Sequence, residues 1–332
     1  MSLTQLLLVP VAILAVWLLR QWAKGGQVRP EDLSRDMAGL NVIVTGGNSG
    51  IGFETALQLA KQGATVFIAS RQKQAGEIAV STIREQSKND QVYFEHLDLA
   101  SLQAVRDFAS RWKNRNEPID ILINNAGVMA LPKRTLTVDG NEIQMATNHL
   151  GHFLLTELLL GHLERAVQAR GSARIINLSS IAHYSAIFDA DDLNSERNTY
   201  GPHEVYSNTK LANILYTRNL AKRLNNSGIT VNAAHPGVVR TPLFRYNRAI
   251  LRLLFFVLEP VIAIFFKTPW EGCQTTLHLA LSDAGKTTTG KYFADCREAG
   301  VYLIYQRLFA AISDELVLET KLVENSKRLV GL

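Results

Sequence analysis

Short apolar runs alternate along the chain with stretches whose apolar residues follow helical spacing. The runs predict buried strands at residues 41–45, 65–69, 92–97, 119–123, 174–178 and 230–234. Between the first two runs, Thr55, Ala56, Leu59 and Ala60 recur at the i, i+4 spacing of one helix face. Strands that alternate with helices through right-handed crossovers predict an α/β fold, a doubly wound parallel sheet with helices on both faces. Because the chain shows no internal repeat or second composition zone, we expect a single domain.

The N-terminus has a different pattern, because residues 3–19 are nearly all apolar. Extended to Trp22, this run would be about 30 Å long as a helix, which matches the hydrocarbon core of a bilayer. A cleaved signal peptide would carry positive charge before the run, whereas the first basic residue, Arg20, follows it. A helix of the globular core is the other alternative. We expect a retained membrane anchor over residues 1–23 and a linker over 24–38, with the rest of the chain on the cytosolic side.

Composition is that of an ordinary globular protein, since 47% of the 332 residues are hydrophobic and 20% are charged. The net charge of +5 comes without a clustered basic run, so we expect no nucleic-acid binding. The two cysteines, Cys273 and Cys296, lack the spacing of a zinc site or of a disulfide framework. We therefore expect two unpaired thiols and no metal.

A glycine-rich turn follows the first predicted strand and precedes the first predicted helix, at Gly46-Gly47-Asn48-Ser49-Gly50-Ile51-Gly52. In this setting glycines let the backbone approach a pyrophosphate, which binds the free N–H groups of the helix N-terminus. A Rossmann-type dinucleotide fold reads the adenosine ribose after its second strand, where an acidic residue would repel a 2′-phosphate. Arg71 lies there and no acid is present, so we expect NADP(H) to be preferred, with NAD(H) still accepted. The alternative is that Arg71 is a solvated loop residue.

Tyr206 and Lys210 are four residues apart, which places both side chains on one face of a helix. A phenol is mostly protonated at neutral pH, and a nearby ammonium lowers its pKa. Such a tyrosine can exchange a proton with a carbonyl or alcohol oxygen while a hydride moves. Alone, the pair also fits an exposed helix surface.

Six motifs in order, over about residues 40 to 295, resemble the short-chain dehydrogenase/reductase family. They are the glycine turn, Asn124-Asn125-Ala126-Gly127, Asn148 in Asn-His-Leu-Gly-His-Phe, Asn177-Leu178-Ser179-Ser180, the Tyr206/Lys210 pair and Pro236-Gly237. The resemblance implies a Rossmann-type fold and an NAD(P)-dependent oxidoreductase.

The resemblance also implies catalytic roles. Tyr206 is the expected proton donor or acceptor, and Lys210 is expected to lower its pKa and to bind the nicotinamide ribose. Ser180, in preference to Ser179, is expected to hold the substrate oxygen. Asn148 is expected to support a water relay toward Lys210.

The implied cofactor contacts follow the same motifs. They are Gly46, Asn48, Ser49, Gly50, Ile51, Gly52, Arg71, Asp98, Leu99, Asn124, Ala126, Gly127, Tyr206, Lys210, Pro236, Gly237 and Thr241. Within this set, Asp98 is expected to meet the adenine and Asn124 the adenosine ribose. Thr241 is expected to contact the nicotinamide or pyrophosphate side.

Segments 153–160, 207–215 and 267–272 further resemble the retinol-dehydrogenase branch of this family. That branch implies long isoprenoid alcohols and aldehydes, retinoid or polyprenoid, as substrates. His183 and His203 flank the active-site segment, and we expect each to be a hydrogen-bonded structural residue rather than a substrate ligand.

The family resemblance also implies a catalytic domain over residues 39–300, with a substrate lid at 241–268 and a C-terminal helical extension at 301–332. The lid is unusually apolar, although Arg252 and Glu259 argue against a simple membrane span. One alternative is a lid that packs on the core. The apolarity favours the other, a lid that rests on the bilayer and admits a lipid-like substrate.

We therefore expect a lipid-like substrate and a membrane, that of the endoplasmic reticulum, as partners, with the catalytic domain facing the cytosol. A homodimer stays open. The alternative function is a membrane-bound interaction protein that keeps the fold and the cofactor but has little catalytic activity. The complete set of Tyr206, Lys210, Ser180 and Asn148 favours the enzyme.

Overall fold

The computed structural model describes residues 3–197, 199–240, 263–300 and 315–332, and of residues 3–12 and 315 it describes the backbone. Eight strands in these ranges form one sheet, in the order β3-β2-β1-β4-β5-β6-β7-β8. The strands are β1 (Asn41–Thr45), β2 (Thr65–Ser70), β3 (Val92–His96), β4 (Ile121–Asn124), β5 (Ala173–Leu178), β6 (Ile229–His235), β7 (Tyr292–Ala294) and β8 (Arg297–Glu298).

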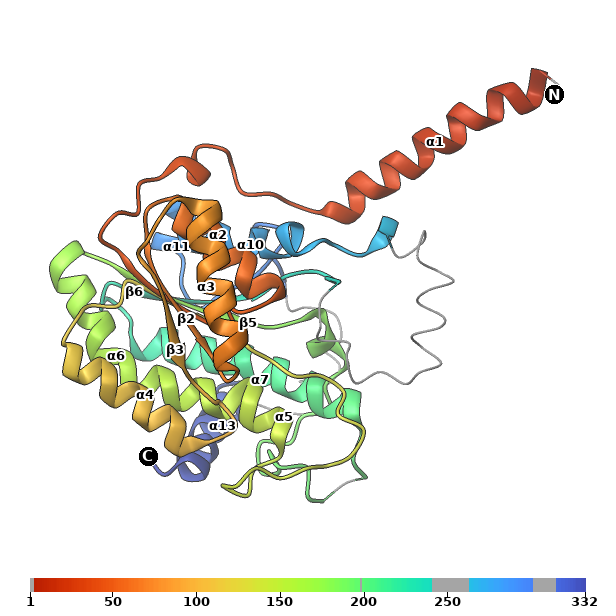
Figure 1. Cartoon of the computed structure of the whole chain (residues 1–332). Helices are drawn as coiled ribbons and strands as arrows, with labels where there is room; N and C mark the ends of the chain where they lie inside the picture. Colours follow the sequence, from red (N-terminus) through yellow and green to blue (C-terminus); the bar gives the residue numbers. More distant parts are fainter. Residues whose placement is uncertain (1–2, 198, 241–262, 301–314) are drawn as a thin grey trace.

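Helices cover both faces of the sheet (Figure 1). They are α1 (Leu3–Lys24), α2 (Gly50–Lys61), α3 (Lys73–Ser87), α4 (Leu102–Arg115), α5 (Ile143–Met145), α6 (Gly151–Arg170), α7 (Pro202–Arg223), α10 (Pro269–Leu281), α11 (Asp283–Thr287) and α13 (Glu315–Val330). Three short segments have other helical geometries. The segments η1 (Asp32–Ser34) and η3 (Ile181–Ser185) are 3₁₀ helices, and η2 (Ala146–Leu150) is a short π helix, called the π turn below.

All six predicted strands are confirmed, and they pair in parallel as predicted. The chain runs outward from β1 to β3, returns to β4 beside β1, and then runs outward on the other side. This reversal is the switch point at which open α/β sheets bind ligands, beyond the carboxyl ends of the strands. β7 and β8 were not predicted, and β8 pairs antiparallel to β7 at the sheet edge.

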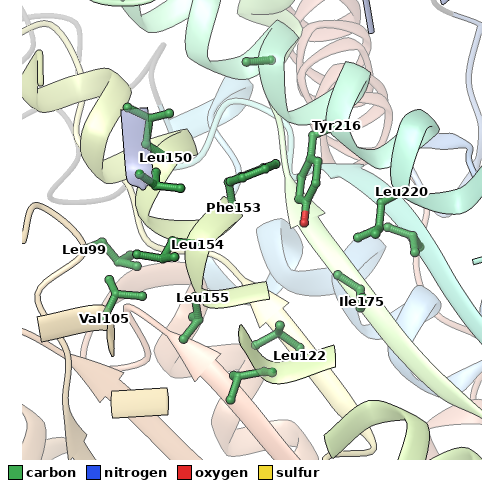
Figure 2. Close-up of a cluster of buried hydrophobic side chains, with 14 of the residues drawn as sticks. Leu99, Val105, Leu122, Leu150, Phe153, Leu154, Leu155, Ile175, Tyr216 and Leu220 are labelled. Carbon is green, nitrogen blue, oxygen red and sulfur yellow. The ribbon is translucent and has the colours of Figure 1, made fainter. Parts of the chain in front are cut away.

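Two apolar clusters, one on each face, hold the helices to the sheet. On one face, Phe153 and Leu154 of α6 pack with Leu122 of β4, Ile175 of β5 and Tyr216 of α7 (Figure 2). On the other face, α2, α3 and α10 cover the same strands. Because both faces are buried, the strands read as continuous apolar runs, which is why the sequence pattern identified them.

The helix α1 extends away from this body (Figure 1). Its described large apolar side chains are exposed, with Trp17 at 54% and Trp22 at 75%. Across the ranges described above, no helix meets both the length and the apolarity that crossing a membrane requires.

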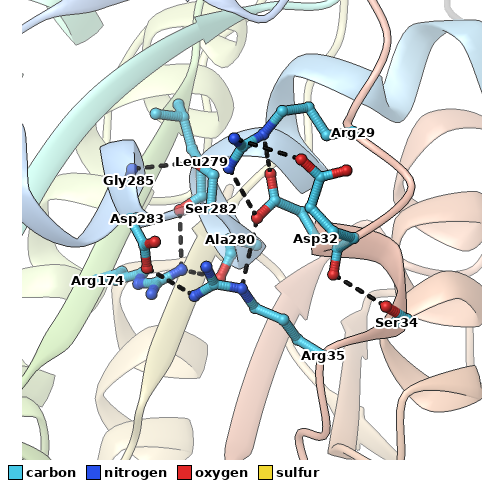
Figure 3. Close-up of polar contacts among 11 residues, drawn as sticks. Arg29, Asp32, Ser34, Arg35, Arg174, Leu279, Ala280, Ser282, Asp283 and Gly285 are labelled. Atoms are coloured by element: carbon cyan, nitrogen blue, oxygen red, sulfur yellow. Dashed lines mark hydrogen bonds and ion pairs between the residues drawn. The ribbon is translucent and has the colours of Figure 1, made fainter.

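The last turns of α1 and the segment that follows them run along α10 from one end to the other. Arg20 forms an ion pair with Glu271 in the first turn of α10, and Val28 N donates to Gln274 Oε1 in its middle. Beyond the end of α10, Arg35 forms a 2.8 Å ion pair with Asp283 (Figure 3). This segment therefore connects the carboxyl edge of the sheet, where α10 begins, with the amino edge.

Candidate active site

The residues predicted from the motifs gather where parallel strands end. The glycine turn follows β1, Arg71 follows β2, Asp98 lies beyond β3, and Ser180 follows β5. These strand ends share one edge of the sheet, which is the expected position for a nucleotide and its substrate.

The glycine turn has the geometry that a pyrophosphate requires. Gly46 and Gly50 have positive φ angles of 66° and 57°, in the left-handed region that glycine tolerates. A Cβ atom on Gly52 would lie 2.4 Å from the carbonyl oxygen of Gly46, so the close turn excludes any larger residue. Ser49, the N-cap of α2, makes no side-chain bond to the first turn, and the N–H groups there are left for an anion.

At the end of β2, beside the predicted ribose site, two polar side chains have no hydrogen-bond partner among the described residues. Arg71 is exposed and makes no hydrogen bond or ion pair within the described part of the chain. The buried Ser70 hydroxyl likewise lacks a hydrogen-bond partner there. These residues fit a cofactor that carries an anionic group at this point. Asp98 accepts a hydrogen bond from Ala100 N, and Leu99 is buried against Gly151. Thr241 lies outside the described residues, as does most of the predicted lid.

Asn124 lies inside the sheet rather than at its rim. Its amide donates to Thr156 Oγ1 and Asn177 Oδ1, at 2.9 and 2.8 Å. Asn177 in turn donates to Thr217 Oγ1. The Asn124 amide nitrogen therefore holds β4 to β5, while its Oδ1 has no hydrogen-bond partner among the described residues.

Tyr206, Lys210 and Ser180 converge. Lys210 Nζ lies 5.5 Å from the centre of the Tyr206 ring, and it donates to Leu178 O at 3.2 Å. The Ser180 hydroxyl lies close enough to the Tyr206 phenol to act against the rise of its pKa. The neighbouring Ser179 hydroxyl is turned inward and donates to Lys210 O at 2.8 Å, which supports the choice of Ser180.

Burial is the largest influence on the pKa values of Tyr206 and Lys210. It raises the pKa of Tyr206 to about 12, against the opposing effect of the Ser180 hydrogen bond. It lowers the pKa of Lys210 to about 8. The sequence led us to expect a phenol pKa lowered by Lys210. Here removal from water is the largest cause at both groups, so the phenol is held protonated at neutral pH.

Asn148 supports the segment after β4. Its side-chain amide makes two hydrogen bonds with the Val128 backbone: Val128 N donates to Asn148 Oδ1 at 2.8 Å, and Asn148 Nδ2 donates to Val128 O at 2.9 Å. Nδ2 also donates to Thr209 Oγ1, and the backbone carbonyl accepts from Asn213 Nδ2. Asn148 is thus bonded to protein groups on both its side chain and its carbonyl.

Two histidines bracket Ser180. His183 Nδ1 donates to Ser180 O at 2.5 Å, while Ile181 N donates to His235 Nδ1 at 3.2 Å. Burial lowers the pKa of His183 to about 4, so the ring is neutral. His183 is therefore hydrogen-bonded within the protein, which agrees with the expected structural role, whereas His203 is exposed at the start of α7. Gly237, beside Pro236, packs on Lys267, where a Cβ would lie 2.6 Å from Lys267 Cδ.

Residues 40–250 match the family described as short chain dehydrogenase. The chain belongs to the short-chain dehydrogenase family. It is thus an NAD(P)-dependent oxidoreductase, with the Rossmann-like parallel sheet that the family uses.

Relatives within the family are retinol dehydrogenases. The chain is 44% identical to retinol dehydrogenase 12 of Bos taurus, with 85% of each chain covered. It is 41% identical to retinol dehydrogenase 13 of Homo sapiens, with 96% of this chain and 92% of that one covered. Among solved structures, a Pseudomonas aeruginosa RhlG/NADP active-site complex is similar, with a TM-score of 0.62, 27% identity, and 80% and 97% coverage.

Thr45 and Asn125 of this short-chain dehydrogenase are site residues to which the sequence motifs assigned no role. The Thr45 hydroxyl accepts from Asn125 N and Ala126 N, and Asn125 Nδ2 donates to Thr45 O at 2.7 Å. These bonds tie the glycine turn to the segment after β4. Asn125 lies within a quoted motif and Thr45 directly precedes the glycine turn, but their pairing depends on β1 lying beside β4.

Proposed function

We propose that the chain reduces and oxidises a hydrophobic carbonyl–alcohol pair of the isoprenoid type, with NADP(H) preferred and Tyr206 as the acid or base. The observation that carries this proposal is the convergence of Tyr206, Lys210 and Ser180 at the carboxyl edge. The names of the relatives, which are retinol dehydrogenases, support a retinoid or polyprenoid substrate.

The proton chemistry follows from the protonation states. A neutral phenol suits a general acid, so Tyr206 would give its proton to the oxygen of a bound aldehyde while Ser180 donates a hydrogen bond to the same oxygen. In the reverse direction, Tyr206 would take the alcohol proton. A bound nicotinamide supplies or accepts the hydride. The Lys210 ammonium would bind the nicotinamide ribose and favour the phenolate that forms after transfer.

The preference for NADP(H) rests on the end of β2. Arg71 is exposed there with no partner in the described residues, and β2 ends in Ser70, so no acidic side chain repels a 2′-phosphate. A guanidinium suits a phosphate because it can donate two parallel hydrogen bonds. NAD(H) would bind without this contact.

We also propose that α1 places the enzyme at a membrane. Apolar residues on all sides of its described part are exposed, among them Ile13, Val16, Trp17 and Leu18. A helix that is apolar all round needs an apolar environment. Its last turns are tied to Glu271 at the start of α10, so the helix leaves the domain on the same edge of the sheet as Tyr206.

The division into an anchor at residues 1–23, a linker at 24–38, a catalytic domain at 39–300 and an extension at 301–332 is part of the proposal. The location at the endoplasmic reticulum, with the domain facing the cytosol, is also part of the proposal. A glycosylation or protease-protection assay on intact microsomes tests the orientation.

The test of substrate class uses the full chain in microsomes with NADPH. Retinaldehyde, farnesal and a longer polyprenal are compared with a small polar aldehyde such as glyceraldehyde. The proposal predicts turnover of the isoprenoid aldehydes at a kcat/KM at least about 100-fold higher, since each buried methylene adds about 0.8 kcal/mol. Equal or better turnover of glyceraldehyde would contradict it.

A further inference from the structure

A buried line of polar side chains connects the C-terminal helix α13 with Lys210. Ser326 Oγ of α13 lies 3.0 Å from His149 Nε2, and His149 Nδ1 lies 3.2 Å from Asn213 Oδ1. Asn213 follows Lys210 by almost one turn of α7. Its amide donates to the carbonyl oxygens of Asn148 and Leu178, at 3.1 and 3.0 Å.

The direction of each hydrogen bond in this line is determined. Two carbonyl oxygens face the Asn213 nitrogen, so its amide oxygen faces His149 and needs a donor. His149 therefore carries its proton on Nδ1, and its Nε2 accepts from the Ser326 hydroxyl. Burial lowers the pKa of His149 to about 4, which keeps the ring neutral with one donor and one acceptor.

The line ends on the group that holds Lys210. Leu178 O accepts from Asn213 Nδ2 at 3.0 Å and from Lys210 Nζ at 3.2 Å. Asn213 therefore shares this carbonyl with the lysine and limits how strongly the carbonyl attracts the ammonium. The same amide also donates to the carbonyl of Asn148, the residue that the sequence led us to expect in a water relay toward Lys210.

The surroundings fix the line in place. Ser326 is 0% exposed and His149 is 1% exposed. The His149 ring packs against Phe153 and Tyr216, with ring centres 6.0 and 6.1 Å apart. The helix α13 is held separately, because Lys222 of α7 pairs with its buried Glu319 at 2.7 Å.

We propose that Ser326, His149 and Asn213 are positioning residues that hold Lys210 for catalysis, so that α13 supports the active site as well as the fold. The proposal rests on the proposed role of Lys210. Without Asn213, Leu178 O would serve Lys210 alone. The ammonium would then move toward that carbonyl, away from the nicotinamide ribose and Tyr206, and its pKa would rise.

Three variants of the full chain in microsomes test this with NADPH and retinaldehyde: Ser326→Ala, Asn213→Ala and the control Asn325→Ala. Asn325 is the neighbour of Ser326, and it bonds Ala190 O outside the line. We expect Ser326→Ala to raise the KM and the Kd for NADPH, the latter by fluorescence, about 3–10-fold, the effect of one lost hydrogen bond. Asn213→Ala should do so more strongly and should move the alkaline limb of kcat/KM to higher pH.

If Ser326 had only a structural role, Ser326→Ala would behave like the control Asn325→Ala. We expect the control to lower the Tm as Ser326→Ala does and to leave the KM, the Kd and the alkaline limb at wild-type values. If Ser326→Ala matches Asn325→Ala in NADPH affinity and pH profile, the positioning role is wrong, even if Asn213→Ala fails to fold.

Lys210→Met separates this proposal from the proposed function. Loss of turnover in Lys210→Met together with an unaffected Ser326→Ala would overturn the positioning role alone. Wild-type turnover in Lys210→Met would overturn both.

Discussion

At the scale of single residues, Tyr206 and Lys210 lie one helical turn apart. Burial raises the pKa of Tyr206 and lowers the pKa of Lys210, so it favours the neutral form of each. The phenol stays protonated throughout the physiological range. The ammonium is the group whose charge is lost at a moderately alkaline pH. Activity should therefore depend on pH through the lysine before it depends on the tyrosine.

The alkaline limb of kcat/KM is the first prediction. Because the pKa of Lys210 is lowered to about 8, the ammonium is present below that pH and is lost above it. We expect kcat/KM for NADPH to be level below pH 7.5 and to fall about tenfold per unit above pH 8. In Lys210→Arg, whose side chain stays charged, any residual activity should lack this limb. A wild-type profile that is level to pH 9.5 would show that this charge is not needed.

Cofactor choice is a second prediction at this scale. Arg71→Asp removes a cation from the end of β2 and adds a charge that repels a 2′-phosphate. We expect the ratio of kcat/KM for NADPH over NADH to fall about 10–100-fold, the range for a hydrogen bond to a charged group. Lys88→Asp, at the exposed end of α3, changes the net charge equally and should leave the ratio unchanged. An unaltered ratio in Arg71→Asp would remove the argument for NADP(H).

Some residue roles could be read from the sequence, and others could not. The family motif led us to prefer Ser180 over Ser179, whose hydroxyl donates to Lys210 O in the structure. Hydrogen-bond partners were not readable, because Asn213 and Ser326 come together only through the packing of α13 on α7. The raised pKa of Tyr206 also depends on burial in the folded environment.

At the scale of elements, the central strands were predictable because both of their faces are buried. β7 and β8 were missed because they have three and two residues, too few to show a period. The π turn η2 was also missed, since apolar spacing does not distinguish it from a helix. It carries Asn148 and His149, and is continuous with α6.

The start of α10 offers a prediction about stability. Thr268 Oγ1 accepts from Glu271 N, and Glu271 accepts in return from Thr268 N, so that the two form a capping box. Thr268→Ala should lower the free energy of unfolding by about 1 kcal/mol, or about 2 °C in Tm. Thr320→Ala, on the exposed face of α13, should be close to neutral by the same thermal melt. An equal effect in both would show that the cap contributes nothing special.

At the scale of the whole molecule, the path of the N-terminal segment relates the anchor to the active site. Arg20 contacts the start of α10 and Val28 contacts its middle, and Arg35 pairs with Asp283 just beyond its end. Gly25 and Gly26 pass so close to Asp295 that a Cβ on either would lie 2.0 Å or less from it. The base of α1 is therefore fixed on the edge where Ser180 and Tyr206 lie.

Removal of α1 tests its proposed role. The full chain should sediment with membranes and stay there in 1 M salt, since apolar burial does not weaken with ionic strength. Deletion of residues 1–22 should release it into the supernatant with NADPH binding retained. Release of the intact chain by salt, or sedimentation of the deletion variant, would contradict an apolar anchor.

The most direct test of the account is the turnover of retinaldehyde with NADPH by Tyr206→Phe, in microsomes beside the wild type. Loss of the phenolic proton should reduce kcat about 10²–10⁴-fold, while Tm and the Kd for NADPH stay near wild-type values, because the ring still packs at the site. A Tyr206→Phe variant with kcat within a few-fold of the wild type would contradict the role of this residue and with it the proposed chemistry.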